Sequence, residues 1–172
     1  MKPQLVVTIV SPDRPGLVDL VSEVIAKHGA NWESSRMVRL GGRFAGVLLA
    51  TAGAGDVEQL TNALEALGTS DMSISVARAD APAPSEGLNL SIQLVGQDRP
   101  GIVHDISAAL AQRHINVEEL HTDCSDAPMA GGQLFTLRAE LRCGADLDVT
   151  ELRDTLEALA HDLMVDISLA AG

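Results

Sequence analysis

Two copies of a four-residue motif, Asp-Arg-Pro-Gly, have residue types suited to binding chemistry; they occupy residues 13–16 and 98–101. Each copy follows an apolar run and precedes a helical pattern, so we expect it where a strand turns into a helix. A helix N-terminus presents unpaired N–H groups and partial positive charge, which suit a carboxylate or a phosphate. The motif's glycine lets a ligand approach closely, and its aspartate could cap the helix or receive a ligand ammonium group.

Two asparagines, Asn31 and Asn116, follow the first helical pattern of each copy. A side-chain amide there could meet the other end of the same ligand. A structural interpretation stays open for both residues, because asparagine is also common in turns of left-handed conformation. The motif itself could be capping and turn chemistry alone, with Arg14 and Arg99 as solvated or paired surface charges.

The sequence offers no catalytic constellation. It contains no G-x-S-x-G, P-loop or H-E-x-x-H pattern, so we expect a protein that is not an enzyme and has no catalytic residues. His121, Asp123 and Cys124 are close in sequence, but alternate side chains of a strand point to opposite faces. His121 and Cys124 would not converge, and we expect no metal site and no cofactor.

The charge balance bears on the kind of partner. The chain has 172 residues with 24 acidic and 12 basic ones, a net charge of −12, and its basic residues are scattered. DNA binding depends on neutralising phosphates with Lys and Arg, and RNA-binding sheets need aromatic platforms, whereas only 2% of these residues are aromatic. We therefore expect no direct nucleic-acid binding. No apolar run is long enough for a bilayer and no signal-peptide pattern occurs, which indicates a cytoplasmic protein.

The motif belongs to a duplication that runs through nearly the whole chain. Between residues 13–36 and 98–121, nine of 24 positions are identical at an offset of 85. Gly41 and Gly42 then match residues 131 and 132 at an offset of 90, so the second copy is expected to carry about five extra residues near 125–129. Further leucines match at an offset of 92: Leu60, Leu64 and Leu67 with Leu152, Leu156 and Leu159.

Each copy shows the same order of elements. Apolar runs predict first strands, stripes at spacings of three and four predict helices, a Gly-Gly pair predicts a hairpin, and an aspartate is placed to cap each second helix. The expected elements are strands at 5–10 and 88–95, first helices from 17 and 102, a hairpin of 32–40 with 43–50, second helices at 56–67 and 148–159, and last strands at 72–77 and 164–169.

This order, βαββαβ twice, predicts an α+β protein with two ferredoxin-like domains in tandem, each an antiparallel sheet with its helices on one face. We place the domains at 1–79 and 88–172, joined by a linker at 80–87 that has two prolines and no large apolar residue. The uncovered face or edge of each sheet needs a partner. Pairing of the two domains, or of two chains in a homodimer, would supply one.

Both halves of the chain resemble the ACT domain. The resemblance lies in a strand that runs through Asp-Arg-Pro-Gly into an amphipathic helix, followed by a short turn into Asn. Two such domains and little else resemble the glycine cleavage system transcriptional repressor family. The resemblance implies binding of an amino acid such as glycine, often at domain interfaces, and action through a DNA-binding partner protein. By position it implies these ligand-binding residues: Asp13, Arg14, Gly16, Leu17 and Asn31 in the first copy, and Asp98, Arg99, Gly101, Ile102 and Asn116 in the second.

The leading hypothesis is therefore a regulatory amino-acid sensor that changes its affinity for a partner protein when it binds its ligand. The alternative is a ligand-free interaction module that regulates a metabolic enzyme or a transcription factor. The copies differ before the motif, where Ser11 and Pro12 stand against Gly96 and Gln97. The two loops therefore need not bind the same ligand.

Overall fold

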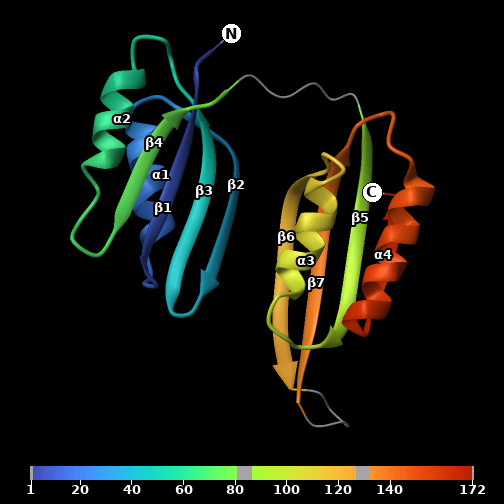
Figure 1. Ribbon diagram of the computed structural model, residues 1–172. Helices are drawn as coiled ribbons and strands as arrows, with labels where there is room; N and C mark the ends of the chain where they lie inside the picture. The colour runs from blue at the N-terminus through green and yellow to red at the C-terminus, as the bar shows by residue number, and fades with distance from the viewer. Residues whose placement is uncertain (1, 81–86, 127–131, 172) are drawn as a thin grey trace. The chain divides into compact units, whose positions relative to one another are not determined.

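The computed structural model describes residues 2–80, 87–126 and 132–171, and it contains the βαββαβ order twice (Figure 1). The chain divides into two compact units, residues 1–82 and 83–172. The first unit consists of β1 (Gln4–Pro12), α1 (Leu17–Lys27), β2 (Asn31–Leu40), β3 (Arg43–Thr51), α2 (Val57–Glu65) and β4 (Ser73–Arg78). The second consists of β5 (Leu88–Gln97), α3 (Ile102–Ala111), β6 (Asn116–Asp126), β7 (Gln133–Cys143), α4 (Val149–Leu163) and β8 (Val165–Ala171). Most of the expected linker, residues 81–86, lies outside the described residues.

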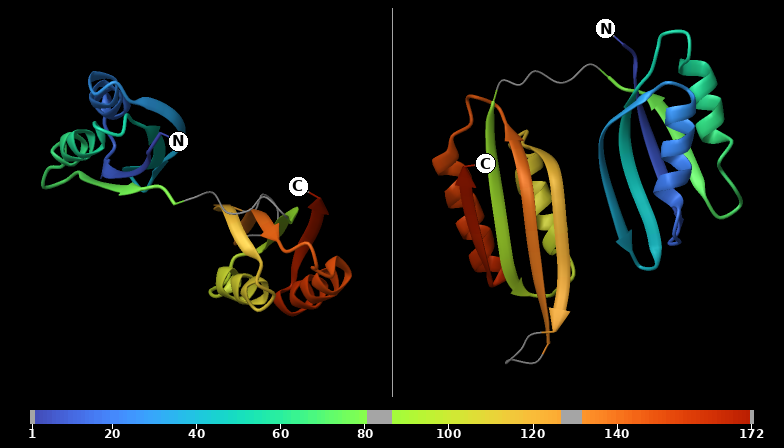
Figure 2. Two further views of the ribbon diagram at one scale, coloured as in Figure 1. Left: turned by 90° about the horizontal axis from the view of Figure 1, so that it is seen from above. Right: turned by 180° about the vertical axis from the view of Figure 1, so that it is seen from behind.

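Both sheets have the same topology. The strand orders are β2-β3-β1-β4 and β6-β7-β5-β8, and all neighbouring strands are antiparallel. In each unit the two helices lie on the same face of the sheet (Figure 2). The predicted α+β fold with two ferredoxin-like domains is confirmed. Among the described residues, no helix combines the length and the apolar character needed to cross a membrane.

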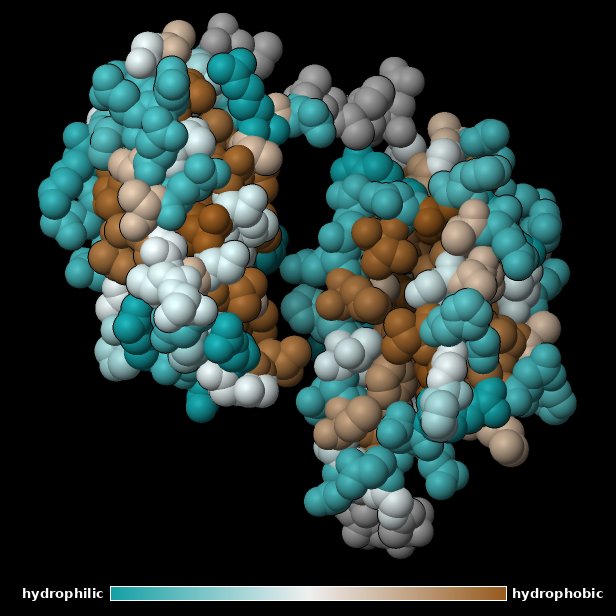
Figure 3. Space-filling model, turned by 60° about the vertical axis from the view of Figure 1, so that its left-hand side comes forward, coloured by the Kyte–Doolittle hydropathy of each residue, from teal (hydrophilic) through white to brown (hydrophobic). Residues whose placement is uncertain are grey.

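Each core lies between the helices and one face of the sheet. Leu5, Val7 and Ile9 alternate along β1 with more exposed residues and point toward the helices. Leu60 and Leu64 of α2 are completely buried against them, as their spacing of four predicts. Apolar side chains also reach the surface between polar ones (Figure 3), so the cores do not absorb all of the apolar residues.

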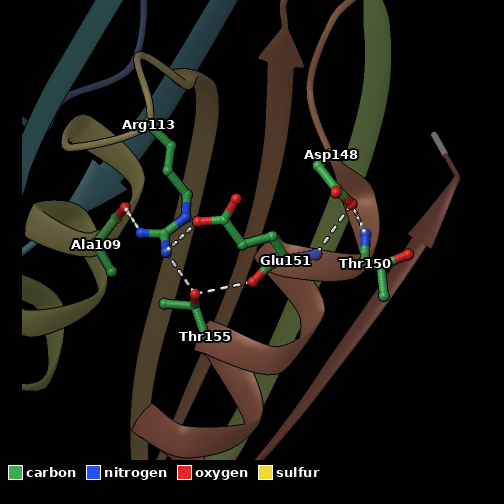
Figure 4. Close-up of polar contacts among 6 residues, drawn as sticks. All are labelled: Ala109, Arg113, Asp148, Thr150, Glu151 and Thr155. Carbon is green, nitrogen blue, oxygen red and sulfur yellow. Dashed lines mark hydrogen bonds and ion pairs between the residues drawn. The ribbon is translucent and has the colours of Figure 1, made fainter.

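Only one of the two expected aspartate caps forms. The Oδ1 atom of Asp148 accepts hydrogen bonds from the N–H groups of Thr150 at 2.9 Å and Glu151 at 3.1 Å (Figure 4). The expectation that Asp56 caps α2 with its side chain is wrong. Asp148 has the extended backbone of a capping residue, whereas Asp56, with φ −102° and ψ −8°, is already in the helical region, where the side chain does not reach back to the free N–H groups.

An arginine side chain joins the two helices of the second unit. The Nη1 atom of Arg113 donates to the carbonyl oxygen of Ala109 at 3.3 Å, and Nη2 donates to the hydroxyl of Thr155 at 2.5 Å (Figure 4). Nη2 also lies 3.5 Å from the carboxylate of Glu151. Because Arg113 lies in the turn just after α3, and Glu151 and Thr155 belong to the first two turns of α4, these contacts couple the start of α4 to the end of α3.

The strand register places the insertion of the second copy more precisely. Pro12 pairs with Arg43 in the first sheet, and Gln97 pairs with Leu134 in the second. The third strands are therefore related by an offset of 91 and not 90, which means six extra residues in place of about five. Asp126 and Gln133 add one pair to the ladder of β6 and β7, and the other extra residues belong to the connection, of which residues 127–131 lie outside the described residues.

Candidate functional site

The two Asp-Arg-Pro-Gly loops adopt the same backbone conformation. Gly16 and Gly101 precede α1 and α3 with φ values of 91° and 99°, a left-handed conformation that L side chains rarely adopt. A Cβ at Gly16 would meet no atom within 4 Å, so the glycine is required by the backbone conformation and not by lack of space. The space before α1 is thus open, whereas a Cβ at Gly101 would lie 3.8 Å from a carboxylate oxygen of Asp105. The capping position is the glycine, so the expectation that the motif's aspartate caps the helix is wrong.

The aspartates of the two loops have different neighbours. Asp13 forms an ion pair with Arg39 of β2, with 2.6 Å between Oδ2 and Nε. Cys124 occupies the equivalent position of β6, at the offset of 85. Partial desolvation together with the carboxylates of Asp98 and Asp123 raises the pKa of the Cys124 thiol, which places Asp98 near that thiol.

Asp98 forms no ion pair among the residues that the structure describes. The carboxylate of the first loop is therefore paired with a cation of β2, whereas the carboxylate of the second loop has no such partner among the described residues.

The remaining loop residues contribute unequally. Leu17 and Ile102 are 5% and 2% exposed, so their side chains belong to the core and only their backbone can face a ligand. Arg14 is exposed. Arg99 is half-buried, and within the described part of the chain its buried Nε atom has no hydrogen-bond partner. The second loop thus holds both an unpaired carboxylate and an incompletely bonded guanidinium group.

Asn31 and Asn116 lie at the opposite end of their sheets from the loops. Asn31 pairs with Thr51, which also pairs with Gln4 at the start of β1, whereas Asp13 follows the end of β1. Eight residue steps along β1 correspond to about 27 Å. The expectation that asparagine and motif meet one ligand is therefore wrong within a single domain, and the second domain has the same arrangement.

The asparagines are not left-handed turn residues either. The positive φ values of these turns belong to Gly29 at 62° and His114 at 55°. Asn31 and Asn116 are the first residues of β2 and β6, where each side-chain amide donates to a glutamate two residues later, at 3.0 Å and 3.3 Å.

Those glutamates form a duplicated feature that sequence reasoning missed. Glu33 and Glu118 are the extra residues of two equivalent β-bulges. Hydrogen bonds from Asn31 and Thr51 lower the pKa of Glu33. A hydrogen bond from Arg142, whose Nε lies 2.9 Å from Oε1, lowers the pKa of Glu118. The Asn-x-Glu pattern, which occurs at residues 31–33 and 116–118, is the sequence signal from which this feature could have been predicted.

Two surface depressions contain no residue of the Asp-Arg-Pro-Gly loops in their lining. One, of about 600 Å³, is lined by residues 68–74 with Val10 and Arg43. The other, of about 340 Å³, lies over β5, β6 and β7 and includes His121 and Val95. Neither is lined by a residue that the sequence analysis proposed as ligand-binding, and no group of three metal-ligating side chains occurs in the described ranges.

Comparison with known proteins identifies the family. Residues 3–76 and 90–141 each match a family model of the ACT domain. The chain is 24% identical over 161 residues to the glycine cleavage system transcriptional repressor of Escherichia coli K12, a match that covers 92% of this chain and 85% of that protein. It is 41% identical over 76 residues to a UPF0237 protein of Methanopyrus kandleri, covering 44% of this chain and 79% of that one.

A solved structure agrees over the full length. The crystal structure of an unknown protein from Galdieria sulphuraria is 32% identical, matches with a TM-score of 0.88, and covers 100% of this chain and 99% of its own. The ACT matches account for both halves of the chain. The protein therefore belongs to the ACT-domain family, with one ACT domain in each half, and is related to a glycine cleavage system transcriptional repressor.

Proposed function

We propose that this protein is a non-enzymatic, cytoplasmic regulator that senses an amino acid, glycine or a similar one. It acts on the transcription of genes of glycine and one-carbon metabolism through a partner protein. The relationship to the Escherichia coli repressor over 92% of the chain supports this role. The net charge of −12 favours action through a DNA-binding partner, because the chain itself would be repelled by phosphates.

The observation that carries the proposal is the duplicated loop, in which a left-handed glycine directly precedes a helix. The backbone N–H groups at the helix start would bind the carboxylate of an amino acid, and the motif's aspartate would bind the ammonium group. In the first domain a ligand would have to displace Arg39 from Asp13. Because Asp98 has no such competitor among the described residues, the second loop is the stronger site.

The proposed ligand-binding residues are therefore expected to contribute unequally to binding. Asp98, Arg99 and the backbone of Gly101 and Ile102 form the main site. The equivalent residues 13, 14, 16 and 17 form a weaker one. Asn116 and its counterpart in the first domain would contribute only to a ligand at the other end of a sheet.

The test is a thermal-shift and calorimetric titration with the twenty common amino acids, glycine first. A ligand at 100 times its dissociation constant stabilises the folded state by about 2.7 kcal/mol. We expect Asp98→Asn to weaken binding at least about tenfold, because a charged hydrogen bond is lost. Cys124→Arg should do the same by supplying the competitor that Asp13 has. Asp13→Asn is the matched control and should leave the tight site unchanged.

Full affinity in both the Asp98→Asn and the Cys124→Arg protein would contradict this site. Replacing both motif glycines by leucine is a poorer test, because φ values of 91° and 99° strain any side chain and confound binding with stability.

The alternative, a ligand-free interaction module, is favoured by one observation: neither surface depression includes a loop residue. It predicts no shift of the melting temperature with any amino acid up to millimolar concentration. A partner protein would then bind equally well with and without amino acids.

A further inference from the structure

The first domain has a loop that the second domain lacks. Residues 66–72 join α2 to β4, whereas Met164 alone joins α4 to β8 (Figure 1). Most of this longer loop lines the depression of about 600 Å³, together with Val10, Arg43 and the first residues of β4. Small-ligand pockets usually have volumes of about 300–1,000 Å³. The depression is therefore large enough for a small metabolite, and its lining is specific to the first domain.

Two strands place polar side chains beside this loop. Arg43 begins β3 and Ser73 begins β4, and both pair with residues near the end of β1 on the open face of the sheet, opposite the helices. The register places Leu134 and Asp166 at the equivalent positions of the second sheet. The second domain therefore has neither this cation nor this hydroxyl, and it has a carboxylate in place of the serine.

The depression offers free hydrogen-bond donors. The Nη2 atom of Arg43 donates to the carbonyl oxygen of Asp71 at 3.3 Å, and its Nε and Nη1 groups have no partner within the described ranges. The hydroxyls of Ser70 and Ser73 are also without a partner in the part of the chain that the structure describes. The carboxylate of Asp71 is partly occupied, because its Oδ1 atom accepts from the hydroxyl of Thr69 at 2.5 Å. A guanidinium group with free N–H groups beside two hydroxyls is suited to a carboxylate.

The charges around the depression favour an anion. The hydrogen bond from Thr69 lowers the pKa of Asp71, and the charges of Arg14 and Arg43 lower it further, which places both guanidinium groups near this carboxylate. Two arginines and one aspartate leave a positive charge in excess. A ligand with a single negative charge neutralises that excess, whereas a zwitterionic amino acid would bring an ammonium group toward two cations.

We propose that this depression binds a small aliphatic carboxylate that has no ammonium group, such as a branched 2-oxo acid. Arg43 binds the carboxylate, and the hydroxyls of Ser70 and Ser73 donate to the remaining oxygens. The aliphatic group packs against Val10, which is 43% exposed, and the half-buried Ile74. None of these residues belongs to the amino-acid site proposed above, so the inference concerns a second kind of ligand.

The test is an NMR titration of the backbone amides of the whole protein at constant ionic strength, with 2-oxoisovalerate, L-valine and inorganic phosphate as probes. The oxo acid and valine share a carbon skeleton, so this pair isolates the effect of the ammonium group. We expect 2-oxoisovalerate to shift the amides of residues 68–74 saturably. The dissociation constant should be on the order of 1 mM, because so small a ligand makes few contacts. Valine and phosphate should bind at least about tenfold more weakly.

Three variants test the assignment of the residues. Arg43→Gln should weaken binding of 2-oxoisovalerate at least about tenfold, because a charge-assisted hydrogen bond is lost. Ser73→Asp introduces the carboxylate that the second domain has at Asp166 and should weaken binding by as much. Arg78→Gln is the matched control: it removes an exposed positive charge at the other end of β4 and should change the dissociation constant by less than about twofold. Circular dichroism melting checks that the variants stay folded.

The absence of a saturable shift at residues 68–74 up to about 20 mM 2-oxoisovalerate would overturn the proposal, and so would unchanged affinity in the Arg43→Gln protein. Valine or phosphate binding there as tightly as the oxo acid would contradict the class of ligand. Asp98→Asn should bind 2-oxoisovalerate like the wild type, because it changes the other domain. Failure of this site and failure of the amino-acid site are therefore distinguishable.

Discussion

Replacing Asp148 by alanine should destabilise the second ACT domain more than the equivalent change at Asp56 destabilises the first. Asp148 accepts hydrogen bonds from two N–H groups at 2.9 Å and 3.1 Å, and Asp56 makes no side-chain cap. Loss of an N-cap costs about 1 kcal/mol, and loss of a negative charge at a helix N-terminus costs about 0.3–1 kcal/mol more. We therefore expect Asp148→Ala to cost about 1–2 kcal/mol, and Asp56→Ala, which removes a charge but no cap, about 0.3–1 kcal/mol.

Hydrogen exchange resolved by peptide separates the two domains, because fragments of α2 and α4 report on different units. The first turn of α4 should exchange faster in the Asp148→Ala protein, and urea unfolding gives the change in free energy. Asp148→Asn keeps an acceptor oxygen and should cost only about 0.5 kcal/mol. Equal destabilisation by the alanine changes at Asp148 and Asp56 would refute the reasoning from cap geometry.

Three further predictions concern single side chains. Asp98→Asn should lower the pKa of the exposed Cys124 thiol and speed its alkylation near neutral pH; an unchanged rate would show that the carboxylate does not act on the thiol. Because the pKa of Glu118 is lowered in the folded state, its carboxylate stabilises the fold above the ordinary pKa of 4.5, and this stabilisation is lost as pH falls through the folded pKa. In both Glu118→Gln and Arg142→Gln, the melting temperature should therefore fall less steeply with decreasing pH than in the wild type. Leu64→Ala, at a completely buried position, should cost about 2–5 kcal/mol by urea unfolding, and a smaller cost would indicate local repacking.

The fold could be predicted from the sequence because its signals are local. The stripe of Leu60 and Leu64 and the hairpin glycines Gly41 and Gly42 each depend on a few neighbouring residues, and the duplication presents every signal twice. The two aspartate caps show the limit of such signals. Identical residues at equivalent positions differ in function, because φ and ψ at Asp56 and Asp148 follow from loops that differ between the copies.

Contacts across strands could not be predicted in the same way. Asn31 is close to the motif in sequence order but lies at the far end of the sheet, because α1 returns the chain to the start of β1. The pairing of Asp13 with Arg39, and the proximity of Asp98 to Cys124, depend on which strands become neighbours.

The duplication, the order of elements and the residues of each helical stripe follow from the amino-acid sequence alone, since they depend on periodicity along the chain. Which face of each sheet the helices cover depends instead on packing in three dimensions. Both faces of β1 are largely apolar, with Leu5 and Val7 on one side and Val6 and Val10 on the other, so alternation alone does not choose between them. The crossover connections place both helices on one side, and this leaves the second apolar row exposed on the open face of the first sheet.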